Sequence, residues 1–574
     1  MHQPNVQPHS SSYFPYEVYP FNRPSDMGAQ ETANHPVVIV GAGPVGLVLA
    51  IQLAQQGVAP VLIEAEAQVS GGSRALALTR RSMEIMEQCG VAERFLTEAI
   101  VWNEGRSYYR NAVVHHLEIA RSDNDKFAPM TNLAQCWIEK FLLDRALELG
   151  VDVRFQTRLD AMRVKDDAVT LTLDTPEGPY SMVADWVAGC DGARSTVRKL
   201  QNLRFEGRSY ESRFVIADFR MELDEPPGRR CYFDPPWLPG HAALMHKAPH
   251  DIWRLDYQVP AEVSDEEALA PERIRSHIAA HLKYIGVHEP WTLEWTTLYK
   301  PNTLTLARYN HGRVMYCGDA AHLLPVFGVR GMNTGVQDAA NLAWKLAAVV
   351  NGLAAPELLD TFSSERVADA RQICFEAARS TRMMAPPTRG FSVMQQAVLS
   401  LSLDHEFTRG LLHWRTSRPI DYAQSPLSWQ DHDECTFTDG PAPGAPPSNV
   451  FLEDTAHGPA YLLDYVRPQF NVLVFGSDTD LWQAIHQDIR TVREAGLPVR
   501  LIAVRSDDTK AADADAVLLD SGGRAAAQWG AQGGAVYVLR PDLHVCARWK
   551  PGSHTQLTQV LVRAMNAAEP VACA

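Results

Sequence analysis

The clearest hydrophobic pattern of this chain lies near its start, where a β-branched apolar run leads into a glycine turn. Residues 37–46 read VVIVGAGPVG, and residues 44–57 continue as PVGLVLAIQLAQQG, the pattern of a buried helix. A second apolar run, APVLIE, ends at Glu64. This order predicts a strand, a tight turn, a helix and a second strand, which together form the βαβ unit of a dinucleotide-binding domain.

Each glycine of this turn has its own predicted role. Gly41 permits the tight turn out of the strand, Gly43 lets the backbone approach phosphates, and Gly46 lets the helix pack close to the strand. The positive end of the helix dipole then faces the anion. Glu64 is placed to accept hydrogen bonds from ribose hydroxyls, and its charge disfavours a 2′-phosphate. We therefore expect a tightly bound FAD or NAD rather than NADP.

The residues after this unit predict further helices and strands. Residues 71–91 read as a glycine-rich loop and an amphipathic helix that Gly90 can terminate. A second helix is predicted over residues 133–150, with Gly150 after its last turn. Residues 151–178 alternate apolar and polar positions, as half-buried antiparallel strands do.

The pattern along the whole chain predicts several structural parts. Strands with Pro-rich turns and one polar helix near 265–285 indicate an inserted sheet, and the loop at 439–449, dense in Pro and Gly, marks a boundary. Short apolar strands after this loop predict an α/β module. The predicted parts are an N-terminal arm (1–34), a discontinuous nucleotide-binding domain (35–204 and 301–370), a substrate-binding sheet domain (205–300), a helical linker (371–438) and a C-terminal module (439–574).

The N-terminal arm lacks the basic start and apolar middle of a secretory signal, and no apolar run in the chain approaches the length of a membrane span. We expect it to be flexible or to wrap the surface. Its aromatic residues suggest docking on the body of the protein or on a second subunit. These aromatic residues are Tyr13, Phe14, Tyr16, Tyr19 and Phe21.

Composition narrows the classes of partner. The 574 residues carry a formal net charge of −15, which argues against a nucleic-acid or anionic-membrane partner. The nine cysteines show no CxxC and no metal-ligand spacing, so we expect reduced thiols in a cytoplasmic protein. His241, His246 and His250 are spaced at five and four residues, but no acidic or cysteine partner is in register, and we favour no metal.

Three motifs in one order resemble the single-component (group A) FAD-dependent aromatic hydroxylases. They are GAGPVG with Glu64, GCDGARSTVR around Asp191, and GDAAH from Gly318 to His322. The resemblance covers about residues 36–370. The C-terminal module resembles the thioredoxin-like domain of phenol hydroxylases and 3-(3-hydroxyphenyl)propionate hydroxylases, without the CxxC needed for redox activity. The implied fold class is α/β: a Rossmann-like FAD-binding domain, an inserted β-sheet substrate domain and a thioredoxin-like module.

The resemblance also assigns contacts to the cofactor. Arg74 reaches the FAD pyrophosphate, Gln135 and Glu139 form a QxxxE helix whose glutamine faces the flavin, and Asp319 binds the ribityl chain. Asp191 and Gly192 match the family motif, although an Asp-Gly pair is also a common β-turn. The predicted cofactor-binding residues are Gly41, Gly43, Gly46, Glu64, Arg74, Gln135, Asp191, Asp319, and the loop residues Gly331, Met332 and Asn333, whose N–H groups bind the flavin pyrimidine edge.

Three residues before this loop are the predicted catalytic candidates: His322, Pro325 and Arg330. Pro325 shapes the loop over the flavin, and in the family its carbonyl can face the reacting carbon. For His322 a structural role, capping the loop, is the favoured alternative to catalysis. Val329 and Arg330 stand where many relatives carry Gly-Gln or Gly-Gly. We hypothesise that Arg330 raises the positive potential near the flavin or the substrate.

The activity implied is a monooxygenase that hydroxylates a small phenolic substrate with NADPH or NADH and O₂ through a flavin C4a-hydroperoxide. No second GxGxxG is present, so NAD(P)H is expected to visit a surface groove. One alternative is an epoxidase or Baeyer–Villiger-type oxygenase acting on a polyketide-like ring. Another is a flavin-binding interaction protein with little turnover. A homodimer is left open.

A group of arginines and aromatic residues in the inserted sheet has two interpretations. It could bind a carboxylated ring, or it could be a solvated face with aromatic core residues. The group consists of Arg229, Arg230, Tyr232, Trp253 and Arg254.

Overall fold

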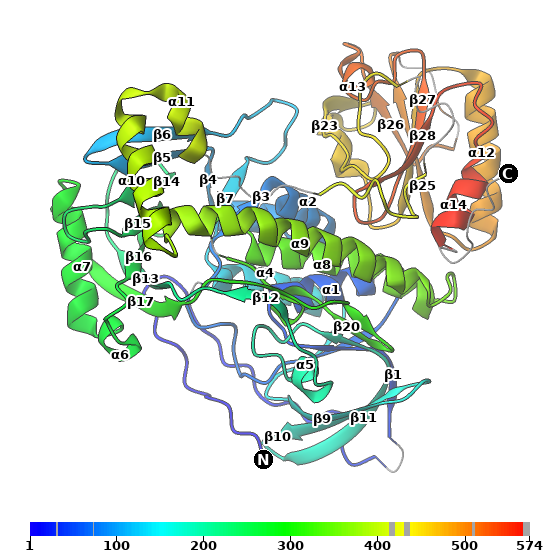
Figure 1. The fold of residues 1–574 in the computed structure, drawn as a ribbon. Helices are drawn as coiled ribbons and strands as arrows, with labels where there is room; N and C mark the ends of the chain where they lie inside the picture. The colour runs from blue at the N-terminus through cyan, green and yellow to red at the C-terminus, as the bar shows by residue number, and fades with distance from the viewer. Residues whose placement is uncertain are drawn as a thin grey trace.

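The computed structural model of the chain places two large sheets side by side, with a third sheet in the C-terminal part (Figure 1). Long helices cross the middle of the molecule between these sheets. The structure describes residues 1–29, 32–72, 74–325, 327–412, 420–429, 437–507, 511 and 513–565. Within these residues, none of the helices is both long and apolar enough to cross a membrane.

The first sheet contains the predicted βαβ unit. Its central strands pair in parallel, as strands joined by crossover helices do. An antiparallel hairpin of β9 (Arg158–Val164) and β10 (Val169–Thr175) extends from β11. In spatial order the main strands are β19 (Asn310–His311), β20 (Val314–Tyr316), β11 (Gly178–Gly189), β1 (Asn34–Val40), β2 (Pro60–Ile63) and β8 (Asp152–Arg154).

Three helices pack together at this sheet and present their ends to the nucleotide site. They are α1 (Pro44–Gln55), α4 (Gln135–Glu148) and α8 (Gly331–Val350). The predicted amphipathic helix is α2 (Arg80–Cys89), which ends at the left-handed Gly90, and Gly150 adopts φ +76° after α4. Both predicted helix ends are confirmed.

The second sheet is antiparallel except for one pair, and it draws on two distant segments. Its strands in order are β17 (Thr292–Tyr299), β13 (Arg213–Arg220), β16 (Ile252–Val259), β15 (Ala242–Lys247), β14 (Arg229–Phe233), β5 (Glu104–Tyr109) and β6 (Ala112–Glu118). The last two lie outside the predicted range of 205–300. These two strands join the sheet through the parallel β14–β5 pair, which links residues more than 100 positions apart. No local sequence pattern predicts a pairing at this separation.

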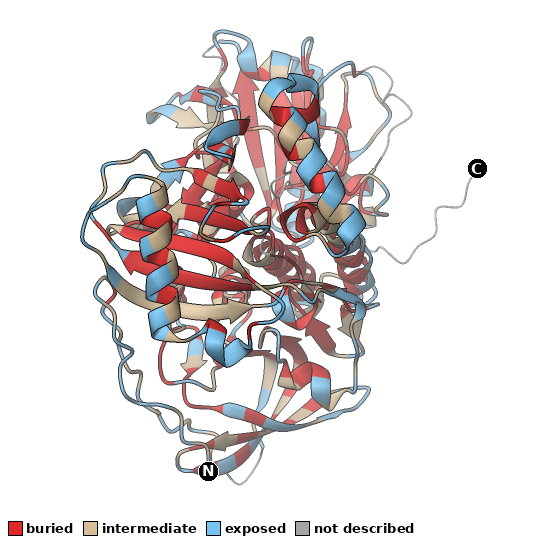
Figure 2. Cartoon of the chain, turned by 60° about the vertical axis from the view of Figure 1, so that its left-hand side comes forward, coloured by how far each residue is buried: buried red, intermediate tan, exposed pale blue. Residues whose placement is uncertain are grey.

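One face of the second sheet packs against helix α7 (Pro271–Tyr284). In Figure 2, which brings this side forward, the strands are largely buried beneath a helix whose outer face is exposed. The predicted polar helix near 265–285 is divided, because Pro271 starts α7 after the short α6 (Asp265–Ala268). The other face of the sheet turns toward the nucleotide-binding half.

Helix α9 (Leu358–Met384) crosses from the C-terminal part to the second sheet (Figure 1). Near its end, α10 (Arg389–Asp404) packs on β5 and β6. The C-terminal sheet has the order β23 (Gly458–Tyr461), β22 (Phe451–Asp454), β26 (Ala516–Leu519), β25 (Val499–Arg505), β24 (Phe470–Phe475), β27 (Ala535–Leu539) and β28 (Val545–Trp549). Strand β24 is parallel to β25 and antiparallel to β27. A thioredoxin-like identity for this part stays a prediction, as do the predicted domain boundaries.

Candidate functional site

The glycine turn after β1 has the geometry that each glycine predicts. Gly41 adopts φ +106°, and a Cβ there would lie 2.6 Å from the carbonyl oxygen of Cys190. A Cβ at Gly46 would lie 2.0 Å from the carbonyl oxygen of Gly41. At Gly43 a Cβ would meet no protein atom within 4 Å, so the N-terminus of α1 opens onto free space. A phosphate group fits at this point.

Glu64 follows β2 directly and lies beside the glycine turn. Its carboxylate accepts hydrogen bonds from the backbone N–H groups of Ala42 (2.7 Å) and Glu66 (3.0 Å). Burial raises the pKa of Glu64, although the residue is only half-buried. The carboxylate therefore lies at the carboxyl end of β2 beside the glycine turn, where the predicted ribose contact requires it.

Asp319 and Arg74 come from distant segments and lie close enough for the charge of Arg74 to act on Asp319. Asp319 is exposed between buried neighbours in the 3₁₀ helix Gly318–Ala320, yet desolvation by the surrounding protein raises its pKa. The charges of His322, Arg74 and Arg198 oppose this shift. The Asp319 carboxylate is accessible and also partly surrounded by protein, so it can accept hydrogen bonds from the hydroxyl groups of a ligand. The predicted ribityl contact agrees with this position.

Helix α4 holds the loop that carries Arg74. Gln135 accepts a hydrogen bond from the N–H of Ala75 (3.0 Å) and donates to Glu139 (2.8 Å). Glu139 in turn accepts from the backbone N–H (2.6 Å) and the hydroxyl (2.9 Å) of Ser70. The QxxxE pair thus fixes the loop, while the Arg74 side chain remains exposed.

Asp191 begins the loop after β11 and caps helix α5 (Thr196–Leu200). Its Oδ2 accepts from the N–H groups of Thr196 (2.6 Å) and Val197 (3.0 Å), and Gly192 adopts φ +73°. Desolvation raises the pKa of Asp191. The Asp-Gly pair therefore makes a turn and caps a helix, and a cofactor contact of Asp191 stays a prediction.

Gly331, Met332 and Asn333 form the first turn of α8, where helix geometry leaves backbone N–H groups without an intrahelical acceptor. The Asn333 side chain has a second role that the sequence did not reveal. Its Oδ1 accepts from the N–H of Thr79 (2.9 Å) and the hydroxyl of Ser82 (2.6 Å). Its Nδ2 donates to the carbonyl oxygens of Ala77 (2.9 Å) and Val329 (3.0 Å).

His322 lies before the loop that leads to α8, in a buried network of charged side chains. The ring and Asp338 are both fully buried, and His322 Nε2 lies 2.6 Å from the Asp338 carboxylate. Asp338 also accepts from the N–H of Gly318 (2.9 Å) and from Arg366 Nε (2.7 Å). These contacts support the structural role for His322. Pro325 is buried in the loop between His322 and α8.

Arg330 points toward α9. Its guanidinium is buried and lies 3.5 Å from the carboxylate of Glu376, and burial lowers its pKa. The preceding Val329 adopts φ +61°, a region that β-branched residues rarely occupy and glycine occupies easily. The proposed effect of Arg330 on the potential near the flavin stays a prediction, and Glu376 offsets part of its charge.

The inner face of the second sheet lies opposite the loop that carries Arg74 and the loop before α8. Arg254 on β16 donates to both oxygens of Asp218 (2.8 and 2.9 Å) and to the carbonyl oxygen of Arg74 (3.3 Å). On the same face, the ring of Phe214 packs edge-on against Phe327, in the loop before α8, at 5.0 Å. The substrate is predicted to bind between these two contacts.

Strand alternation separates the arginine and aromatic residues that the sequence grouped together. Arg229 and Arg254 lie on the inner face and are 6% and 4% exposed, so a solvated face is wrong for them. Tyr232 and Trp253 pack on the opposite face with α7, and Arg230 pairs with a glutamate there.

The three histidines of this sheet do not form a cluster. His246 lies in register between Arg229 and Arg254, and burial together with these two charges lowers its pKa to about 3. His250 stacks against Tyr13 and Trp137. Over the described ranges there is no group of three or more His, Cys, Asp or Glu side chains suited to a metal ion.

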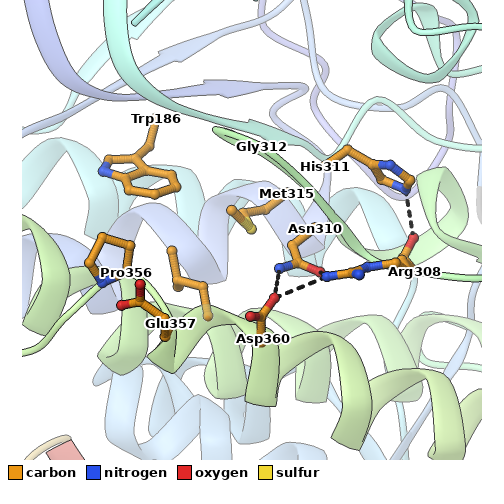
Figure 3. Close-up of a pocket in the computed structure, with 10 residues that line it drawn as sticks. Trp186, Arg308, Asn310, His311, Gly312, Met315, Pro356, Glu357 and Asp360 are labelled. Atoms are coloured by element: carbon orange, nitrogen blue, oxygen red, sulfur yellow. Dashed lines mark hydrogen bonds and ion pairs between the residues drawn. The ribbon is translucent and has the colours of Figure 1, made fainter. Parts of the chain in front are cut away.

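A hollow of about 460 Å³ lies elsewhere, between the first sheet and the start of α9 (Figure 3). Asp360 accepts hydrogen bonds there from Arg308 (3.0 Å) and Asn310 (2.6 Å). Trp186 and Pro356 form its other side. None of the predicted site residues lines this hollow, so it is separate from the flavin site.

The dinucleotide turn, the position of Asp319 and the second sheet opposite the Arg74 loop agree with the comparisons, which define an FAD-dependent monooxygenase of the aromatic hydroxylase class, with NAD(P)H as co-substrate. A family model described as "FAD binding domain" matches residues 34–377, more than half of the chain, and the protein belongs to this family. The predicted α/β fold with an FAD-binding domain, the class of enzyme and the cofactor are confirmed, whereas the thioredoxin-like identity of the C-terminal part stays a prediction.

Several known proteins are similar over most of their length. The 3-(3-hydroxy-phenyl)propionate/3-hydroxycinnamic acid hydroxylase of Mycolicibacterium smegmatis is 30% identical, covering 88% of this chain and 89% of that protein. The enzyme of the same name from Escherichia coli is 27% identical, covering 94% and 97%. The solved structure of the flavin-dependent monooxygenase PieE with FAD and substrate aligns with a TM-score of 0.75 at 23% identity, covering 93% and 99%. OxyS anhydrotetracycline hydroxylase from Streptomyces rimosus aligns at 0.67 with 26% identity, covering 94% and 100%.

Proposed function

We propose that the protein hydroxylates a small phenol that carries a carboxylate on its side chain. The observation that carries this proposal is Arg229, a buried arginine on the inner face of the second sheet. Its Nη2 is buried without a hydrogen-bond partner among the described residues, and burial lowers its pKa. A buried cation with an unused donor is costly, and an anionic ligand group would relieve that cost.

The names of the relatives agree with this chemistry. The hydroxylases from Mycolicibacterium smegmatis and Escherichia coli act, by name, on 3-(3-hydroxy-phenyl)propionate and 3-hydroxycinnamic acid. Both compounds are phenols with a three-carbon side chain that ends in a carboxylate. At 30% and 27% identity the resemblance supports the same substrate class for this chain.

Asp256 is the proposed acceptor of the phenol proton. It follows Arg254 by two residues on β16, so both side chains lie on the inner face. Asp256 lies opposite Ile216 of β13 and Leu244 of β15. On the inner face it lies between the contact of the sheet with Arg74 and the contact of the sheet with Phe327. Burial raises the pKa of Asp256 to about 7, which suits proton transfer near neutral pH.

The apolar residues around Asp256 are proposed to contact the substrate ring and to exclude water. When bound and reduced by NAD(P)H, FAD supplies the oxygen transfer from O₂. The chain itself binds the ring, takes up the phenol proton and excludes water from the reaction. Phe214, Phe327 and Leu244 are buried on this side of the sheet and provide a dry surface for the ring.

The test is steady-state oxidation of NADH and NADPH by the Arg229→Met protein across phenols with and without a carboxylate, with H₂O₂ measured in parallel. We expect kcat/KM to fall about 100-fold for carboxylated phenols and to change little for uncharged phenols. Arg230→Met is the matched control, because Arg230 is the next residue, points to the other face and pairs with Glu225. The Arg230→Met change should leave kcat/KM unchanged for both carboxylated and uncharged phenols.

Equal losses for charged and uncharged phenols in the Arg229→Met protein would contradict the carboxylate contact. Coupled turnover only with larger polycyclic rings would favour the second candidate, a hydroxylase of polyketide-like substrates. The similarity to OxyS anhydrotetracycline hydroxylase is the observation that favours this candidate.

A further inference from the structure

The N-terminal arm, residues 1–29, lies along the segment that joins Glu64 to Arg74. It contacts this segment repeatedly with its own backbone and side chains. The Tyr19 N–H donates to the Ala67 carbonyl oxygen (2.7 Å), and the His9 N–H donates to the side chain of Gln68 (3.1 Å). Gln68 donates back to the carbonyl oxygen of Gln7 (3.0 Å). The arm therefore covers a defined stretch of the nucleotide-binding half.

Tyr16 makes the contact nearest to Arg74. Its hydroxyl accepts a hydrogen bond from the N–H of Gly72 (2.9 Å) and donates to the carbonyl oxygen of Ser70 (3.3 Å). The ring packs edge-on against Phe14, which is 4% exposed and belongs to the main core. Tyr16 is thus anchored in the body of the protein and holds two backbone groups of the loop.

Gly72 is enclosed by the arm on one side and by the second sheet on the other. It adopts φ +74°, and a Cβ there would lie 2.1 Å from the ring of Trp295 on β17. Glu139 of α4 holds the neighbouring Ser70 from a third direction. The backbone at Ser70 and Gly72 is therefore held by Tyr16 together with these neighbours.

We propose that the arm is part of the FAD site and that Tyr16 is a positioning residue for the cofactor. The segment under the arm begins at Glu64, next to the glycine turn, and ends at Arg74, next to Asp319. When Tyr16 fixes this segment, both ends keep their places around the nucleotide. The Tyr16 hydroxyl contacts the backbone at Ser70 and Gly72, so its removal is expected to affect retention of FAD and to leave the oxygenation step itself unchanged.

The test compares Tyr16→Phe with Tyr19→Phe in the full-length holoprotein. Both changes remove one hydroxyl from the same arm and keep the ring. The Tyr19 hydroxyl donates to Glu17 of the arm (3.4 Å), so its loss should not reach the cofactor. FAD fluorescence recovered on dilution gives the release rate, and titration of the apoprotein with FAD gives the dissociation constant.

Tyr16→Phe is expected to raise the FAD dissociation constant about five- to tenfold, because the Gly72 N–H loses its acceptor. The release rate should rise by a similar factor, with kcat at saturating FAD unchanged. The melting temperature of the apoprotein should stay near the wild-type value, while the increase on adding FAD becomes smaller.

Two outcomes would overturn the proposal. One is a Tyr16→Phe protein whose FAD affinity and release rate match the wild type, whatever its melting temperature. The other is equal weakening by Tyr16→Phe and Tyr19→Phe, which would show that the loop contact at Gly72 has no special role. His9→Ala offers a second variant, because the His9 ring lies against Gly71 of the same loop.

Discussion

The buried carboxylate of Asp256 makes the stability of the folded protein depend on pH. Burial raises its pKa to about 7, and the nearby charge of Asp218 adds to the shift, whereas Arg254 and Arg229 oppose it. The folded protein therefore holds this proton more tightly than the unfolded chain does. The stabilising contribution is complete below the ordinary carboxyl pKa and is lost as the pH rises through about 7.

Asp256→Asn should remove this pH dependence. Between pH 5 and pH 8 the free energy of unfolding of the wild type is expected to fall by on the order of 2 kcal/mol more than that of the variant. Urea denaturation of the apoprotein at both pH values measures this difference. Asp251→Asn, in the turn before β16, is the control and should follow the wild type. Parallel behaviour of wild type and Asp256→Asn would contradict the assignment.

Helix α8 runs from Gly331, in the loop predicted to bind the flavin, to contacts with the C-terminal part of the chain. Asn341 and Lys345 lie on its later turns in a buried cluster with Glu365 of α9. Arg540, after β27, donates to both oxygens of Glu365 (2.7 and 2.9 Å). Although burial opposes it, the charges of Arg540 and Lys345 hold the pKa of Glu365 well below its usual range.

Replacement of Arg540 should destabilise the protein strongly. Arg540→Met leaves Glu365 and Asp542 buried with fewer partners, and we expect a loss of about 3 kcal/mol in the free energy of unfolding. Urea unfolding of the holoprotein measures the loss. Arg524→Met, on the exposed surface of the C-terminal part, serves as the control and should change stability by less than about 0.5 kcal/mol. A loss no larger than in this control would mean that the cluster contributes nothing to stability.

At the scale of the whole molecule, the C-terminal part shares a hydrophobic core with the FAD-binding half. Trp344, Ala348 and Leu358 belong to the same buried cluster as Phe470 and Trp549. A chain with one continuous core between two parts is expected to unfold as one unit.

Calorimetry of the full chain should therefore show a single unfolding transition. Added FAD should shift the entire transition upward, since the cofactor binds only the folded state. A chain ending at residue 438 should aggregate, because Trp344 would be uncovered. A separate transition that FAD leaves in place would contradict this prediction and would indicate an independent C-terminal domain.

Local patterns predicted much of the fold and part of the site. The glycine turn and the helices ending before Gly90 and Gly150 depend on short-range geometry, whereas Asp319 was implied only by the family resemblance. The β14–β5 pairing and the cofactor-side contacts of Tyr16 join segments far apart in the chain, and no local pattern reports such pairs. Asp256 did leave a signal: polar residues alternate at Arg254, Asp256 and Gln258 within an otherwise apolar strand.

The contacts of the arm also bear on the order of events during synthesis. The arm leaves the ribosome before the second sheet does, but its Ser12 N–H donates to Glu294 (2.5 Å), and Trp295 closes the far side of the loop that Tyr16 holds. The arm cannot reach its final position until about 300 residues have emerged. A nascent chain shorter than this would present an open nucleotide site, so capture of the flavin is expected late in biogenesis, after the second sheet has formed.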